Sequence, residues 1–78
     1  MKKLCYKKLW KMLIDRDMKK KDLSKLSGVS TTSLAKMKRN ENVTTDNLVK
    51  ICEVLNCDIS DIAEIIDEEQ EMEEKANA

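Results

Sequence analysis

The side chains of this chain that could do chemistry are hydrogen-bond donors gathered in one short stretch. Hydroxyl, amide and cationic groups crowd residues 19–42. The candidate binding residues among them are Lys19, Lys20, Ser30, Thr31, Thr32, Ser33, Lys36, Arg39 and Asn42. Such groups suit binding to a partner rich in acceptors and negative charge. Bond-breaking chemistry is not expected, because the chain has no His, no paired buried carboxylate, no phosphate-cradling Gly loop and no Cys with a base. We therefore expect a binding protein and not an enzyme.

The charge distribution favours a polyanionic partner. Residues 1–40 carry 13 Lys and Arg and 3 Asp and Glu, a net charge of +10, whereas residues 41–78 carry 2 and 12, a net charge of −10. The zero net charge of the whole chain therefore hides a basic half and an acidic half. All but one of the donors lie in the basic half, as a nucleic-acid partner would require.

Size and composition indicate one small helical domain. A chain of 78 residues buries roughly 60% of its unfolded surface, which allows one core and little room for a catalytic cleft. One Gly, no Pro and no Phe argue against a protein of strands and turns. No stretch approaches the ~18 apolar residues of a membrane span, so we expect a cytosolic protein.

The three cysteines predict neither a metal site nor a disulfide framework. Cys5, Cys52 and Cys57 are odd in number, form no Cys-x-x-Cys pair and have no His to assist them. Reduced structural thiols are expected, and no metal or other cofactor.

Apolar residues recur at helical spacing in five segments. The first three helices are expected over about 6–15, 20–27 and 31–39. A fourth helix should follow an N-cap at Thr44, and a fifth should follow an N-cap at Asp58. The fifth helix would carry an apolar stripe formed by Ile59, Ile62, Ala63 and Ile66. From Asp67 the composition turns strongly acidic, so we divide the chain into a domain at 1–66 and a frayed or disordered tail at 67–78.

The second and third of these helices predict a helix-turn-helix. Leu23 and Leu26 give the second helix an apolar face, and Leu34 and Met37 give one to the third. Residues 28–30, Gly-Val-Ser, join them: the Gly suits a left-handed helix end, the Val should plug the angle between the helices, and the Ser is a good N-cap. All these apolar residues are expected in the core, and Asn40 is expected to end the third helix in left-handed geometry.

Residues 18–39 and 44–59 together resemble the Cro/repressor-type (XRE-like) helix-turn-helix family, in particular its short single-domain transcriptional regulators. The Leu…Leu-x-Gly-Val-Ser…Leu-x-x-Met pattern is matched together with both downstream helices, and the resemblance covers about residues 6–66. It implies an all-α, five-helix, lambda-repressor-like DNA-binding domain, here with an acidic C-terminal tail. Its partner would be double-stranded DNA.

The resemblance also implies which donors read bases and which helix start lies against a phosphate. Base edges would be read by Thr31, Thr32 and Lys36, since Thr can bond a base edge and contact the thymine methyl while Lys can donate to guanine. The phosphate would lie at the helix start that carries Lys19 and Lys20. By their own chemistry, suitable partners for the DNA backbone are Lys19, Lys20, Ser30, Ser33, Arg39 and Asn42.

Three departures from the family pattern concern the ends of helices. Lys19 and Lys20 stand where the family often has Thr and Gln, which should weaken that helix end by ~0.5–2 kcal/mol but add charge for phosphate. Lys38 stands where Glu is common, and Asn40 where Gly is common.

Four apolar residues, Ile14, Val49, Val54 and Ile65, lie off the main stripes. Exposed together they would form a patch, so we expect a homodimer through the fifth helix and the flank of the fourth. Such a dimer would read half-sites about one helical turn, ~34 Å, apart.

Two functions stay open at this point. The first is a sequence-specific DNA-binding regulator, of repressor type, that reads operator DNA in the major groove through the third helix. The alternative is an antitoxin-type or protein-interaction module that keeps the fold with weak or no DNA binding. Reversing the charge of Lys36 and Arg39 separates them, because only the first requires these cations for duplex affinity.

Overall fold

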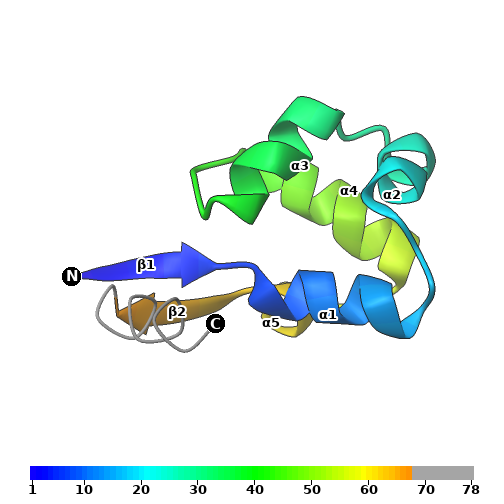
Figure 1. The fold of residues 1–78 in the computed structure, drawn as a ribbon. Helices are drawn as coiled ribbons and strands as arrows, with labels where there is room; N and C mark the ends of the chain where they lie inside the picture. The colour runs from blue at the N-terminus through cyan, green and yellow to red at the C-terminus, as the bar shows by residue number, and fades with distance from the viewer. Residues whose placement is uncertain (68–78) are drawn as a thin grey trace.

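Five helices and a two-stranded sheet make up the described part of the chain, residues 1–67 of a computed structural model (Figure 1). The elements in chain order are β1 (Lys2–Cys5), α1 (Lys7–Asp15), α2 (Lys20–Ser27), α3 (Thr31–Lys38), α4 (Thr45–Leu55), α5 (Ile59–Ile62) and β2 (Glu64–Asp67). The predicted tail lies outside the described residues except for Asp67, which ends β2. Over 1–67 no helix combines the length and the apolar character that a membrane crossing needs.

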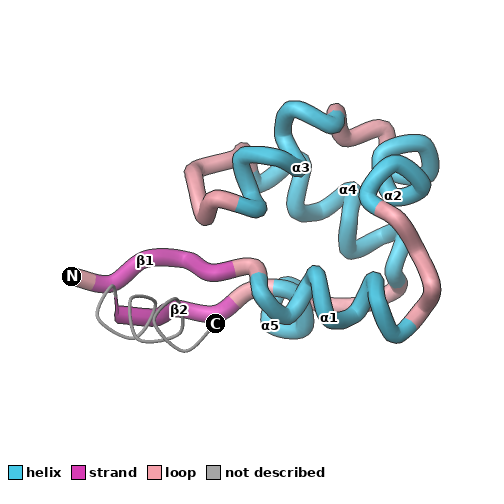
Figure 2. The backbone as a smooth tube through the Cα atoms, in the orientation of Figure 1, coloured by secondary structure: helices cyan, strands magenta, loops and turns pink. Residues whose placement is uncertain are grey.

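The sheet corrects the expectation of an all-α fold. β1 and β2, from opposite ends of the domain, pair antiparallel with Leu4 opposite Ile65 and Lys2 opposite Asp67 (Figure 2). The end pair also forms an ion pair, with Nζ and Oδ2 3.6 Å apart. Each strand has only four residues, so neither is evident without its partner.

The fifth helix is correspondingly shorter than predicted. α5 ends after one turn at Ile62, and Ala63 adopts extended backbone angles, φ −142° and ψ 152°. Ile66, predicted on the helical stripe, lies in β2 instead. The physical reason is that the adjacent β-branched Ile65 and Ile66 favour a strand once β1 supplies a pairing edge.

The core lies where the helices meet, and most of the expected apolar residues form it. The side chains that share this buried cluster include Leu9, Leu13, Leu23, Val29, Leu34, Met37, Leu48, Ile51, Leu55 and Ile62. Tyr6 is buried with them, and Trp10 packs half-buried against their edge.

Leu26 is the exception, since its side chain is 63% exposed. On α2 the residue four positions after Leu23 is Ser27, and Ser27 takes the inward place and donates its hydroxyl to the Leu23 carbonyl at 2.6 Å. The prediction that Leu26 lies in the core is therefore wrong, because the elements packed on α2 cover the side that carries Leu23 and Ser27 and leave Leu26 in solvent.

The predicted helix ends are confirmed. Gly28 has φ +79° and ends α2 in left-handed geometry, and Asn40 has φ +57° just after α3. Ser30 and Thr44 are the N-caps of α3 and α4, and each side chain accepts the N–H of the residue three positions on. Asp58 likewise caps α5.

Substitution of Leu34, which is buried, and of Leu26, which is exposed, tests the packing seen in the structure against the packing expected from the sequence. Leu34→Ala should lower the free energy of unfolding by about 2–5 kcal/mol, because Leu34 is 1% exposed and its removal leaves a cavity. Leu26→Ala, the matched control, should change it by about 0.5 kcal/mol or less. Urea unfolding followed by circular dichroism measures both, and equal losses would contradict this account of α2.

Candidate nucleic-acid interface

The turn between α2 and α3 is fixed by one buried side chain and two serine hydroxyls. Val29 is 1% exposed and fills the angle between the helices, as predicted. Ser24 donates its hydroxyl to the Val29 carbonyl at 2.7 Å, and the Val29 N–H donates to the Ser27 hydroxyl at 3.1 Å. Because both polar backbone groups of Val29 have partners, the turn can be buried without an unsatisfied donor or acceptor. The angle between α2 and α3 is thereby set.

The inward face of α3 determines which residues point outward. Leu34 and Met37 are buried, and on the opposite side Thr31, Thr32 and Lys36 are all exposed. The three predicted base-reading residues therefore share the solvent face of one helix. Their spacing puts Lys36 one turn beyond Thr32 on that face.

Ala35 lies on the same exposed face and was missed by the sequence analysis. It stands four residues after Thr31 and three after Thr32, so the helical spacing alone could have identified it. A methyl group at this place is suited to contact with a thymine methyl.

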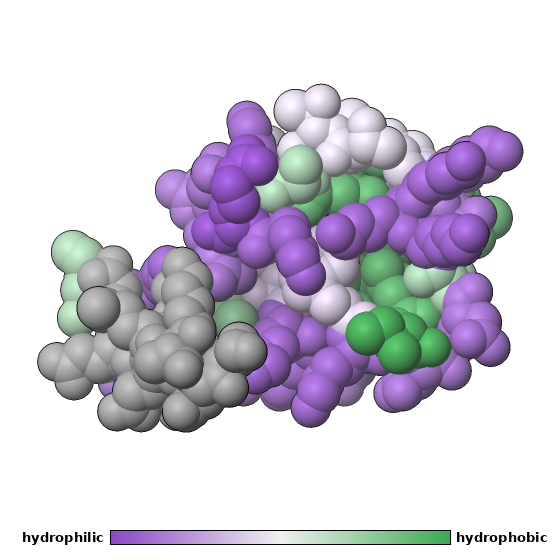
Figure 3. Space-filling model, in the orientation of Figure 1, coloured by the Kyte–Doolittle hydropathy of each residue, from purple (hydrophilic) through white to green (hydrophobic). Residues whose placement is uncertain are grey.

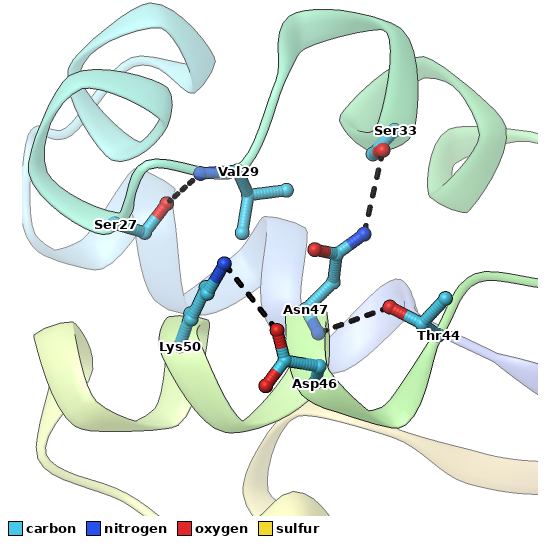
Figure 4. A network of polar contacts seen from close by, with 7 residues as sticks. All are labelled: Ser27, Val29, Ser33, Thr44, Asp46, Asn47 and Lys50. Atoms are coloured by element: carbon cyan, nitrogen blue, oxygen red, sulfur yellow. Dashed lines mark hydrogen bonds and ion pairs between the residues drawn. The ribbon is translucent and has the colours of Figure 1, made fainter.

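The start of α3 is tied to α4 by a chain of side-chain hydrogen bonds (Figure 4). The Ser30 hydroxyl accepts the Ser33 N–H and donates to the Ser33 hydroxyl, both at 3.1 Å. The Asn47 side-chain amide donates to the same Ser33 oxygen at 3.4 Å, and the Asn47 N–H donates to the Thr44 hydroxyl at 3.3 Å. Ser33 is therefore half-buried and engaged within the fold, and only its own hydroxyl proton is left for a ligand.

Arg39, at the other end of α3, already holds an anion. Its Nε donates to Oε2 of Glu41 at 2.6 Å, and Nη2 donates to Oε1 at 3.5 Å. This hydrogen bond raises the pKa of Arg39 and lowers the pKa of Glu41. Both groups are exposed, so a phosphate can compete with the carboxylate for the guanidinium. Glu41 was not predicted from the sequence as a partner, although its opposite charge lies only two residues from Arg39.

The start of α2 carries cations, and its N-cap, Lys19, makes no side-chain cap hydrogen bond. The Lys19 N–H donates to the Asp22 carboxylate at 3.0 Å, which satisfies one exposed donor of the helix start. Lys19 and Lys20 themselves are exposed, as are Ser30 and Asn42 among the other predicted backbone contacts.

A groove of about 290 Å³ runs between the start of α2 and the outer face of α3. Lys20 and Lys21 line it from α2, and Thr31, Ala35 and Arg39 line it from α3. The structure thus brings predicted base-reading and backbone-contacting residues onto one surface. The other predicted residues do not line this groove, and they are Thr32, Lys36, Lys19, Ser30, Ser33 and Asn42.

Asn40 explains one departure from the family pattern. Its side-chain oxygen accepts the Tyr6 N–H at 3.3 Å, which ties the end of α3 to the start of α1. Glycine could adopt the same left-handed backbone but could not supply this acceptor. Asn40 therefore serves both the helix end and the position of α3.

Comparisons with known proteins agree with this geometry. The family model of the Cro/C1-type HTH DNA-binding domain matches residues 8–68. Among solved structures, the crystal structure of "transcriptional regulator VanUg, Form II" is similar, with 52% sequence identity and a TM-score of 0.79. The match covers 83% of this chain and 87% of that one. No curated protein sequence matches the chain.

The ion pair at the end of α3 can be tested by titration. In Arg39→Gln the pKa of Glu41 should rise toward its ordinary value, because the hydrogen bond that lowers it is lost. Lys36→Gln should raise it less, because Lys36 acts only through its charge. Side-chain carboxyl chemical shifts measured by NMR against pH report both values. A Glu41 pKa that does not move in Arg39→Gln would show that the pair does not form in solution.

Proposed function

The chain belongs to the Cro/C1-type helix-turn-helix DNA-binding family, and we propose that it is a repressor-type transcriptional regulator that reads operator DNA in the major groove through α3. The observation that carries this proposal is the outer face of α3. Thr31, Thr32, Ala35 and Lys36 are exposed there, and Thr31 and Ala35 lie beside Lys20 and Lys21 of α2. The match to a family of DNA-binding domains supports the expectation of a binding protein.

In this proposal, recognition of the DNA base sequence depends on few contacts. Thr31 and Thr32 would offer one hydroxyl and one methyl each, and Lys36 would donate to guanine O6 and N7. None of the three is an Arg, Asn or Gln, whose two-point contacts discriminate bases most strongly. Phosphate contacts must then supply much of the affinity, which makes binding steeply dependent on salt.

The backbone contacts would come from both sides of α3. Lys19 and Lys20 stand at the start of α2, where the positive end of the helix dipole adds to their charge. Ser30 and Asn42 are exposed, whereas Arg39 must exchange Glu41 for a phosphate. Ser33 would act mainly by holding α3 against α4. Binding to operator DNA would be compatible with the cytosolic location expected from the sequence.

We further propose a homodimer through the flank of α4 and the segment that follows it. Val49 is 47% exposed, Ile59 in α5 is 41% exposed and Ile65 in β2 is 62% exposed. Val54 is half-buried. Ile14 does not belong to this surface, because it lies on α1 beside the lysines of α2. A two-fold dimer would place two copies of α3 about one helical turn, ~34 Å, apart.

Selection from a random duplex pool at two salt concentrations tests the proposed reading by α3. We expect an inverted repeat for the wild-type protein. Lys36→Gln should then cost about 1–3 kcal/mol on the selected duplex and relax the preference at one base pair. Lys11→Gln, which removes the same charge from an exposed position of α1, should leave the preference unchanged. Anisotropy titrations on selected and scrambled duplexes measure these effects.

Two results would contradict the proposal. Equal weakening of both duplexes by Lys36→Gln would reduce that residue to a backbone contact. No enrichment and no binding at low salt would favour the protein-interaction module instead.

Light scattering tests the proposed dimer. The wild-type protein should have the mass of two chains at tens of micromolar, and Ile65→Asp should shift it toward one chain, because a buried carboxylate would be desolvated in the interface. Leu26→Asp is the matched control, since Leu26 is as exposed as Ile65 but lies on α2. A wild-type monomer would contradict the dimer in the absence of DNA.

A further inference from the structure

We propose that Trp10 is a positioning residue for DNA binding, whose indole ring holds Lys20 and Lys38 at a groove that receives the sugar–phosphate backbone beside α3. This inference rests on the proposed function, because it adds a part to the same site. It assigns a role to Trp10, the one tryptophan of the chain, and to Lys38, one of the lysines that depart from the family pattern.

Three helices contribute to this arrangement. Trp10 lies on α1, Lys20 is the first residue of α2 and Lys38 is the last residue of α3. The Lys20 ammonium lies 5.1 Å from the ring centroid, and the Lys38 ammonium lies 5.5 Å from it. Both are within the roughly 6 Å at which a cation is attracted to an aromatic face. One ring thereby links the two ends of the helix-turn-helix that flank the proposed reading surface.

Among residues 1–67, the two ammonium groups have no partner besides the ring, because no hydrogen bond or ion pair joins Lys20 or Lys38 to a carboxylate there. Two like charges beside one ring repel each other, and the negative face of the indole offsets this repulsion only in part. A phosphate between or beside them would remove it. The two charges are therefore arranged for an anion that residues 1–67 do not supply at this place.

The groove beside the ring combines an apolar part with lysines around it. Its volume is about 480 Å³. Leu13, Ile14 and Met18 form its apolar part, and Lys19 and Lys21 join the two ring-bound lysines around it. Figure 3 shows this pattern as a hydrophobic area near the end of α1 with hydrophilic side chains around it. An apolar floor suits the deoxyribose, and the lysines suit the phosphates on either side of it.

The groove is continuous with the surface that α3 would present to bases. Lys20, Lys21 and Lys38 line both this groove and the smaller one, which Thr31 and Ala35 also line. A strand held by the lysines would therefore pass directly beside the first turn of α3. Trp10 would act on DNA through the two lysines, because its ring fixes where their charges stand.

A double-mutant cycle separates this role from simple packing of Trp10 against the core. On the selected duplex, Trp10→Leu should weaken binding roughly threefold to tenfold, from the loss of two cation–aromatic contacts. Lys20→Gln with Lys38→Gln should reduce the magnitude of the log–log salt slope by about 2, for two lost phosphate contacts. Trp10→Leu added to that pair should then change the affinity no further. Trp10→Phe, which keeps an aromatic face, should restore most of the affinity.

An equal effect of Trp10→Leu in both backgrounds would overturn the proposal, as would a Trp10→Phe variant that binds no better than Trp10→Leu. Urea unfolding of each variant shows that the folded state persists. Lys11→Gln controls for the loss of one exposed charge and should leave the salt slope unchanged.

A second measurement needs no DNA. Because Trp10 is the only tryptophan, its fluorescence reports on the groove alone. Iodide should quench it more strongly than neutral acrylamide does, since the lysines concentrate anions there. This preference should fall in Lys20→Gln with Lys38→Gln and persist in Lys11→Gln. An unchanged preference in the double variant would show that the ring does not hold the two ammonium groups. Wild-type protein that binds no duplex at low salt would instead overturn the proposed function, and the iodide result still decides the geometry.

Discussion

Burial of Val29 between α2 and α3 is the contact on which the rest of this structure depends. The turn can bring Val29 inward only because Gly28 adopts φ +79° and because Ser24 and Ser27 satisfy the polar groups of the Val29 backbone. Once the angle between the helices is set, Leu34 must face the core, and the opposite side of α3 must face solvent. The orientation of the proposed reading surface is thus a consequence of packing.

The basic half of the chain must also tolerate its own charge. Arg39 is neutralised by Glu41, whereas Lys20 and Lys38 stand against the face of Trp10. These two arrangements differ in what a polyanion must displace. At Arg39, a phosphate has to replace the Glu41 carboxylate. At Lys20 and Lys38, a phosphate displaces no carboxylate of residues 1–67, because each ammonium group is held there only by its weak attraction to the Trp10 ring. We therefore expect the ring-bound lysines to be the readier part of the proposed surface for the DNA backbone.

Contacts between residues distant in sequence hold α3 to the remainder of the domain. Asn40 accepts the Tyr6 N–H, and Asn47 of α4 donates to Ser33 at the start of α3. The sheet likewise joins two segments that are distant in sequence. β1 leads directly into α1, and β2 follows directly from α5. The helix that would enter the groove is consequently anchored at both ends, which favours a preformed binding surface over one that must order on binding.

The sequence by itself determined the first four helices, the predicted caps and the exposed face of α3, because these depend on residues three or four positions apart. Gly28, Ser30 and Thr44 could be placed for that reason, and so could the exposure of Thr31, Thr32 and Lys36. Only the tertiary structure decided the rest. The pairing of β1 with β2 and the gathering of Lys20 and Lys38 on Trp10 join segments that no local pattern links. The exposure of Leu26 likewise depended on which side of α2 the other helices cover.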